Sequence, residues 1–289
     1  MSDGSPPLPN NRLGHPGRVP EPSREGTRRA ELAGSPRDDD DQDITADTLR
    51  AGRVRIFQPA RGARMSLDPV LLEGFLPPPH GRFLDIGCGT GALSFLLLAR
   101  DPAAVGVGVE LQPRLAALAA RGRDENGWQQ RLEIVVGDVR ALGDRLGAAR
   151  FDLVATNPPY RTLAGSRRPP DDERALSHQE IALALPEWIE CAARAVRPGG
   201  RVAAIFPAER AADLLAELRA RDLTACRFRS VHPRAGEPAS RVLVEAERGG
   251  RRPLRAGRRP LIVEPPLVLH ADGARYTPEV LRLLDEQQV

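Results

Sequence analysis

Short apolar runs alternate along the chain with longer stretches in which apolar residues recur every three or four positions. The runs have the length of buried strands, and the longer stretches have the period of a helix. The predicted strands span residues 83–86, 105–109, 132–136, 151–156 and 201–206, and the predicted helices span 92–100, 113–123, 140–146, 178–196 and 208–221. This alternation predicts an α/β fold, a Rossmann-like, doubly wound parallel sheet with helices on both faces.

Two more apolar runs follow the last of these helices, over residues 223–231 and 240–247. If they pair as a hairpin, one of them lies antiparallel to the other strands of a seven-stranded sheet. Thr277-Pro278-Glu279 then has the form of a helix start, with proline at the first helical position. The leucines after it predict a short amphipathic closing helix.

Weaker patterns precede the sheet. Residues 53–58 alternate enough to predict a short strand. Ser66-Leu67-Asp68-Pro69 is typical of a helix start, with Ser66 or Asp68 as the N-cap of a helix that reaches Phe75. Ser177 is the corresponding cap expected for the 178–196 helix.

Composition divides the chain into three parts. Residues 1–50 are rich in proline, glycine and charge, include the acidic run Asp38–Asp41 and lack periodicity, so we predict a disordered tail. Residues 51–250 hold the alternating pattern and form the predicted domain. Residues 251–289 are a basic C-terminal extension that ends in the closing helix.

The composition of the whole chain excludes several classes of protein. The 289 residues contain no apolar stretch of 18 or more and no apolar signal-peptide core, so we expect a cytoplasmic protein without a membrane segment. The three cysteines, Cys88, Cys191 and Cys226, have neither disulfide nor metal-ligand spacing, so no metal site is expected. All 42 basic residues are arginine, at a net charge of +3, which permits a nucleic-acid partner.

A glycine-rich turn, Gly87-Cys88-Gly89-Thr90-Gly91, joins the 83–86 strand to the 92–100 helix. A strand, a glycine turn and a helix N-terminus together form a backbone cradle for a nucleotide-like ligand. The spacing is G-x-G-x-G rather than the G-x-G-x-x-G that binds a pyrophosphate. A nicotinamide-dependent oxidoreductase would be expected to have glycine at position 92, where this chain has alanine.

A residue with a carboxylate side chain lies at the end of each of the next two predicted strands. Glu110 lies 19 residues past Gly91, about where an acidic residue accepts hydrogen bonds from both ribose hydroxyls. As a helix N-terminal acid alone it would contribute only ~0.3–1 kcal/mol. Asp138 follows the 132–136 strand at the same topological level, where its carboxylate can meet the edge of an adenine.

The 151–156 strand ends in Asn157-Pro158-Pro159-Tyr160. Proline stops a strand because it lacks an N–H and has a fixed φ. The side-chain oxygen of Asn157 and the carbonyl of Pro158 can both accept from the NH2 of a planar group, while the Tyr160 ring stacks on its plane. Holding both N–H bonds turns the nitrogen lone pair toward an electrophile.

These four features lie at the carboxyl ends of consecutive predicted strands, where open α/β sheets bind ligands. On these motifs the chain resembles class I S-adenosylmethionine-dependent methyltransferases. Asp85–Gly91 resembles the first motif of that class, Glu110 its ribose acid and Gly137-Asp138 its adenine-contact motif. Asn157–Tyr160 resembles the motif of enzymes that methylate planar amino nitrogens.

The resemblance implies S-adenosyl-L-methionine as the cofactor and an exocyclic amino group as the methyl acceptor. The implied cofactor-binding residues are Arg64, Asp68, Asp85, Gly87, Cys88, Gly89, Gly91, Glu110 and Asp138, and the implied catalytic residues are Asn157, Pro158, Pro159 and Tyr160. Among them, the glycines would let the backbone approach the methionine part of the cofactor. Asp85 would orient their loop or meet the cofactor's amino group.

Four less specific motifs resemble, within that class, the bacterial tRNA(Val) adenine-N6 methyltransferase family, which modifies the adenine next to the anticodon. They are Arg64–Leu72, Asn157–Arg161, Arg197–Gly200 and Arg275–Glu279. The resemblance implies tRNA as the partner and adenine N6 as the acceptor, and we expect a monomer. Residues 161–174 and 251–259 are arginine-rich and form either an RNA-binding surface or a solubilising face.

Several alternatives remain at this point. Glutamine N5 methylation of a protein uses a similar motif, but release-factor enzymes of that type carry a helical N-terminal domain that residues 1–50 cannot form. Guanine-N2 methylation of rRNA typically has phenylalanine in place of Tyr160. DNA adenine methylation usually needs a separate target-recognition domain. A non-catalytic RNA-binding module would be expected to have lost Asn157.

Overall fold

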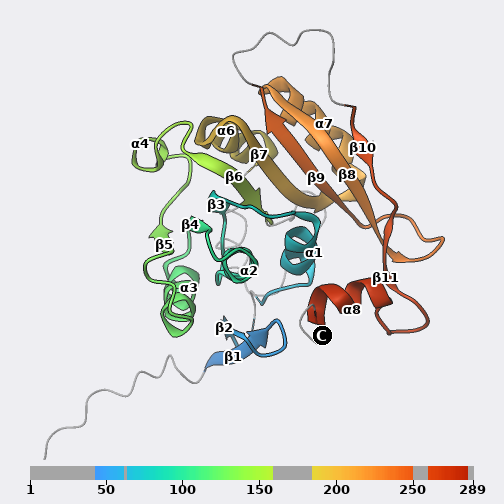
Figure 1. Cartoon of the computed structure of the whole chain (residues 1–289), viewed down its shortest axis with the longest axis horizontal. Helices are drawn as coiled ribbons and strands as arrows, with labels where there is room; N and C mark the ends of the chain where they lie inside the picture. The colour runs from blue at the N-terminus through green and yellow to red at the C-terminus, as the bar shows by residue number, and fades with distance from the viewer. Residues whose placement is uncertain (1–42, 62–63, 159–183, 250–259, 286–289) are drawn as a thin grey trace, which may run out of the picture. The chain divides into compact units, whose positions relative to one another are not determined.

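The structure, a computed structural model, describes residues 43–61, 64–158, 184–249 and 260–285 of the chain. Its central feature is a nine-stranded sheet flanked by helices (Figure 1). The strands of this sheet are β3 (Arg82–Ile86), β4 (Val105–Glu110), β5 (Leu132–Val136), β6 (Phe151–Thr156), β7 (Val196–Pro207), β8 (Leu223–Arg234), β9 (Arg241–Arg248), β10 (Ile262–Val263) and β11 (Leu267–His270).

The described helices connect these strands or flank the sheet. They are α1 (Asp68–Phe75), α2 (Ala92–Arg100), α3 (Pro113–Glu125), α4 (Gly143–Leu146), α6 (Leu185–Ala195), the 3-10 turn η2 (Ala208–Arg210), α7 (Ala211–Ala220) and α8 (Pro278–Asp285). Among the described helices, none has the length and apolarity that a membrane span requires.

The strand order confirms the predicted doubly wound sheet. The order is β10-β8-β9-β7-β6-β3-β4-β5, and β11 also pairs with β8. Strand β9 is antiparallel to both β7 and β8, whereas the other described pairings in this sheet are parallel. The predicted seven-stranded sheet with one antiparallel strand is therefore present, and β10 and β11 extend it beyond β8.

The core lies on both faces of the sheet, because successive side chains of a strand point to opposite faces. Phe83 of β3 and Leu153 of β6 are buried with α1 and α2 on one face. Leu84 and Val154, their neighbours in sequence, are buried with α6 and α7 on the other face, around Trp188. Figure 1 shows the two helix layers on either side of the central strands.

The central strands end at the same level. Ile86, the last residue of β3, pairs with Thr156 of β6 and with Val109 of β4. The Thr156 hydroxyl donates to the Ile86 carbonyl at 2.8 Å. Because the topology reverses between β3 and β6, a crevice is expected outside these carboxyl ends.

Several predicted helix starts differ from the observed ones, and α7 begins at Ala211, after the 3-10 turn at the predicted start. The N-cap of α1 is Leu67, without a side-chain cap, and the Ser66 hydroxyl accepts from the Asp68 N–H at 3.2 Å. Helix α4 begins at Gly143 rather than at residue 140, because the Asp138 side chain accepts from the Arg140 N–H at 2.9 Å and forms a turn there.

Helix α6 begins at Leu185 rather than at residue 178. Ala184 before it is extended, and its N–H donates to the Glu187 carboxylate at 2.8 Å. This contact satisfies one of the groups that a helix start leaves unpaired. Ser177, the expected cap, lies outside the described residues.

The N-terminal boundary also differs from expectation. Residues 44–49, which we assigned to the tail, form strand β1 (Ile44–Leu49), antiparallel to β2 (Val54–Pro59). The oxygen Oδ2 of Asp47 accepts from Gln58 and Arg64, each at 2.9 Å. These contacts span 11 and 17 residues, more than one strand or helix period covers, so the pattern of apolar residues does not predict them. Residues 1–42 lie outside the described part of the chain.

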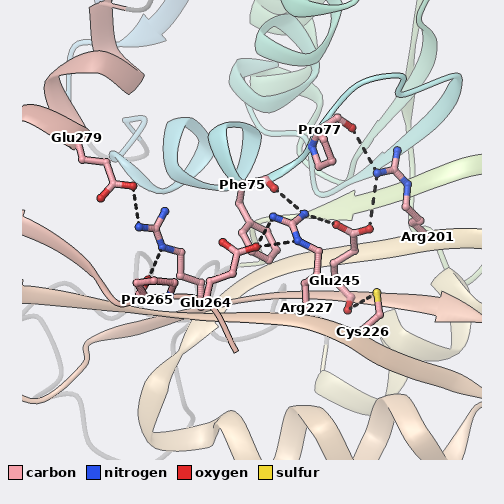
Figure 2. A network of polar contacts seen from close by, with 10 residues as sticks. Phe75, Pro77, Arg201, Cys226, Arg227, Glu245, Glu264, Pro265 and Glu279 are labelled. Atoms are coloured by element: carbon pink, nitrogen blue, oxygen red, sulfur yellow. Dashed lines mark hydrogen bonds and ion pairs between the residues drawn. The ribbon is translucent and has the colours of Figure 1, made fainter. Parts of the chain in front are cut away.

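The C-terminal segment is attached to the sheet by a network of ion pairs (Figure 2). Arg227 of β8 contacts Glu245 of β9 at 2.8 Å and Glu264, which follows β10, at 2.5 Å. The same guanidinium lies over the Phe75 ring, 4.2 Å from its centroid, and donates to the Phe75 carbonyl at 3.0 Å. Arg229 and Glu279, 2.7 Å apart, form a second link.

We expect Glu245→Gln to destabilise the protein more than Glu264→Gln does. The Glu245 side chain is only 6% exposed and also lies 3.6 Å from Arg201, whereas that of Glu264 is 24% exposed. Urea unfolding should give a loss of about 3 kcal/mol for Glu245→Gln, because a buried pair is broken. The loss for Glu264→Gln should be about 1 kcal/mol or less. The reverse order would contradict this account of the network.

Candidate active site

One cavity of about 460 Å³ opens at the carboxyl ends of β3, β4, β5 and β6. That volume lies in the range of small-molecule sites. The predicted site residues that line it are Arg64, Asp68, Asp85, Gly87, Cys88, Gly89, Glu110, Asp138, Asn157 and Pro158. Pro159 and Tyr160 lie outside the described residues, and of the predicted residues that the structure does describe, only Gly91 is absent from the lining.

The glycine loop has the backbone of a ligand cradle. Gly87 and Gly89 have φ values of +72° and +56°, and a Cβ added to either would meet no atom within 4 Å. Both residues line the cavity, so a ligand can approach their bare backbone closely. Gly91 serves packing instead: it caps α2 at φ +90°, and a Cβ there would lie 2.6 Å from the Phe95 ring.

Glu110 is held in place by backbone donors on both of its oxygens. Oε2 accepts from the Gly89 N–H and Oε1 from the Gln112 N–H, each at 2.9 Å. The side chain therefore fixes the glycine loop to the end of β4. Each carboxylate oxygen has a second lone pair, so a ribose diol can still be bound.

Asp85 joins the end of β3 to the start of α2, the two elements that the glycine loop connects. It is 1% exposed, and its Oδ2 accepts from the Ser94 N–H at 3.1 Å and from the Ser94 hydroxyl at 2.7 Å. Burial raises the pKa of Asp85 to about 7, against the opposing effect of the Ser94 hydrogen bonds, and the charge of Glu110 raises it further. Burial likewise raises the pKa of the neighbouring Cys88 thiol well above its ordinary value.

The position of Asp138 is also set by the backbone. The Gly137 N–H donates to the Glu110 carbonyl at 2.9 Å, so the two acidic residues lie side by side at the ends of β4 and β5. Hydrogen bonds from Arg140 hold the pKa of Asp138 below its usual value. Arg140 also lines the cavity. Sequence reasoning missed it, because an arginine two residues after Asp138 is a common pattern and does not by itself indicate a site.

The N-terminal wall of the cavity depends on long-range ion pairs. The Arg64 guanidinium donates to the Thr45 hydroxyl at 2.8 Å and to Asp47 at 2.9 Å, so the β1–β2 hairpin holds it. Asp68 lies 3.4 Å from Arg241 of β9, which also lines the cavity. Sequence reasoning missed Arg241 because it follows Asp68 by 173 residues.

Asn157 and Pro158 lie beside the glycine loop. Thr156 of β6 pairs with Ile86 of the neighbouring strand β3. Asn157 and Pro158 follow Thr156, and Gly87 follows Ile86. Adjacent strands are ~4.8 Å apart, so the Asn157 amide and the glycine loop both border the same cavity. The predicted meeting of the ligand cradle and the Asn-Pro motif on one edge of the sheet is therefore present.

The fold and this cavity define a methyltransferase that uses S-adenosyl-L-methionine. A family model described as "Methyltransferase small domain" matches residues 67–206. The crystal structure of a predicted O-methyltransferase from Agrobacterium tumefaciens superimposes with a TM-score of 0.59 at 25% identity, covering 75% of this chain and 95% of that one.

Curated relatives narrow the class. A tRNA1(Val) (adenine(37)-N6)-methyltransferase of Porphyromonas gingivalis is 30% identical over 249 residues, 84% of this chain and 95% of the relative. One from Aeromonas hydrophila is 30% identical over 188 residues, 64% of this chain and 77% of the relative. The chain belongs to the family of tRNA1(Val) (adenine(37)-N6)-methyltransferases.

The residues present fit the cofactor. The open space over Gly87 and Gly89 accepts a close ligand, and Glu110 keeps acceptor capacity for a diol. Leu111, 38% exposed, offers an apolar surface beside them in the cavity lining. Such a mixture of apolar surface and a few fixed acceptors suits a nucleoside.

We expect Gly89→Ala to weaken binding of S-adenosyl-L-methionine by about tenfold or more in calorimetry, because the added methyl group occupies the cradle. Gly127→Ala is the matched control. Gly127 has φ +72° and also meets no atom within 4 Å, but it does not line the cavity. Both variants should lose roughly 1–2 kcal/mol of stability from the positive φ. Equal cofactor affinity in the two variants would contradict the cradle.

Asp85 should make stability depend on pH. Its pKa in the folded protein is about 7 against an ordinary 3.8, so the folded state binds more protons in that window. The free energy of unfolding therefore falls as pH rises from about 4 to about 7 and levels off above. Urea unfolding across this range should show a shallower fall for Asp85→Asn. A variant with the wild-type slope would mean that another group titrates.

Proposed function

We propose that the protein transfers the methyl group of S-adenosyl-L-methionine to N6 of adenine 37 in tRNA1(Val), the reaction for which its relatives are named. One observation carries the proposal. The glycine cradle, Glu110 and Asp138 share a single cavity with Asn157 and Pro158. A methyl donor and a planar amine can thus meet inside it.

In this proposal the two sides of the cavity have different tasks. The cofactor, when bound, supplies an electrophilic methyl group on a sulfonium. Glu110 accepts from the ribose hydroxyls and Asp138 from the adenine, which fixes the donor. The Asn157 side-chain oxygen and the Pro158 carbonyl accept from the target NH2 and aim its lone pair. Catalysis is then mainly positioning for an in-line displacement, and the amine proton leaves after attack.

The target adenine must leave its stack to enter the cavity, at a cost of a few kcal/mol. Stacking on Tyr160 would offset roughly 1–3 kcal/mol of this cost. Pro159 and Tyr160 complete the proposed catalytic motif, although they lie outside the described residues. We also propose that the protein acts as a cytoplasmic monomer. Residues 51–250, together with strand β1, would form its catalytic domain, and the basic extension 251–289 would contact the RNA.

The test is incubation of the full-length protein with labelled S-adenosyl-L-methionine and separate pools of tRNA, rRNA, DNA and release factor, followed by nucleoside and amino-acid analysis. We expect N6-methyladenosine in tRNA alone. Methylguanosine in rRNA or methylglutamine in release factor would replace the proposal with one of the alternatives.

Asn157→Ala should reduce turnover to background while it leaves the cofactor dissociation constant within about twofold, because the proposal gives the amide a bond to the acceptor and none to the cofactor. Single-turnover assays and calorimetry measure the two quantities. Gly127→Ala, outside the cavity, is expected to retain activity. A large loss of cofactor affinity in Asn157→Ala would contradict this division between donor and acceptor sides.

A further inference from the structure

Arg140 lines the cavity, but the proposed function gives it no task. Its side chain binds the one carboxylate proposed to contact the cofactor adenine. Nε lies 3.0 and 2.9 Å from the two oxygens of Asp138, and Nη2 lies 2.5 Å from Oδ2. The backbone N–H of Arg140 adds a further bond to Oδ1 at 2.9 Å.

The other end of the guanidinium is held by helix α6. Nη1 donates to Oε1 of Glu187 at 2.9 Å. The second oxygen of Glu187 accepts from the Ala184 N–H at 2.8 Å, at the start of α6. Arg140 is therefore fixed between the end of β5 and a helix start, although 46% of its side chain is exposed.

These contacts determine what Asp138 can offer a ligand. Three N–H groups of Arg140 reach the carboxylate: the backbone N–H, Nε–H and Nη2–H. The single Nε–H is shared between both oxygens of Asp138, so three hydrogens make the four hydrogen bonds. An ionised carboxylate has about four acceptor positions, so three hydrogens leave room for about one donor from a ligand. Because its neighbours fix its orientation, the carboxylate does not have to be ordered when a ligand binds. A single, aimed acceptor suits an exocyclic amino group.

We propose that Arg140 is a positioning residue that presents Asp138 to the 6-amino group of the cofactor adenine, with Glu187 holding Arg140 in place. This inference rests on the cofactor side of the proposed function. It makes recognition of the amino group depend on a residue that does not itself contact the adenine.

The test compares two ligands by calorimetry: S-adenosyl-L-methionine and its analogue with purine in place of adenine, which lacks the 6-amino group. Wild type should bind the natural cofactor more tightly. Arg140→Ala should raise the dissociation constant for the natural cofactor about tenfold and leave that for the analogue nearly unchanged. Arg140→Lys keeps the charge but not the two-point contact, so it should lie in between and serves if the alanine variant does not fold.

Two further variants separate positioning from simple support of the fold. Glu187→Gln should raise the dissociation constant for the natural cofactor only about twofold, because Arg140 still holds Asp138. Arg221→Ala is the matched control: Arg221 pairs with Glu217 and with Glu190 of α6, as Arg140 pairs with two acids, but it does not line the cavity. It should leave both dissociation constants unchanged.

Each contrary result overturns the inference. Equal weakening of both ligands by Arg140→Ala would indicate a merely structural role, and tighter binding would show that Arg140 competes with the adenine. A wild type that does not distinguish the ligands would remove the role of Asp138. The proposed function would fail separately, through absence of methylated tRNA from a protein that still prefers the natural cofactor.

Discussion

The parallel pairing of β3 with β6 is the interaction on which the site depends. It places Ile86 opposite Thr156, and the Thr156 hydroxyl bonds the Ile86 carbonyl at 2.8 Å. The glycine loop follows Ile86 at the end of β3, and the Asn157 motif follows Thr156 at the end of β6. A shift of one residue in this register would turn the side chains of β6 to the opposite faces. The glycine loop and Asn157 would then no longer line the same cavity.

The carboxylates of the cavity bind the protein as well as its proposed ligand. Glu110 holds the loop at Gly89, Asp85 holds the end of β3 to α2, and Asp138 is held by Arg140. Each acid is ordered by hydrogen bonds before any ligand arrives, which lowers the entropic cost of binding. Burial raises the pKa of Asp85, and the charge of nearby Glu110 raises it further. The surrounding donors offset part of that cost.

The β1–β2 hairpin and the C-terminal segment contact elements that line the cavity. The β1–β2 hairpin holds Arg64 through Asp47, and Arg227 joins the C-terminal segment to the end of α1. Helix α1 begins at Asp68, which faces the cavity, so the C-terminal segment and the cofactor side of the site are connected through one helix. The Arg64–Asp47 and Arg227–Glu264 ion pairs have partly exposed partners, and their net effect depends on the whole network.

The sequence by itself determined the sheet, its seven core strands and the position of the motif residues at the carboxyl ends of those strands. The reason is that the hydrophobic period of a strand, and a glycine or proline at its end, are local signals. It also determined the family. The tertiary structure alone decided the places of Arg140 and Arg241, the strand at residues 44–49 and the attachment of β10 and β11 to β8. Their partners lie on other elements, many of them far away in sequence, and pairings of that kind leave no periodic trace in the chain.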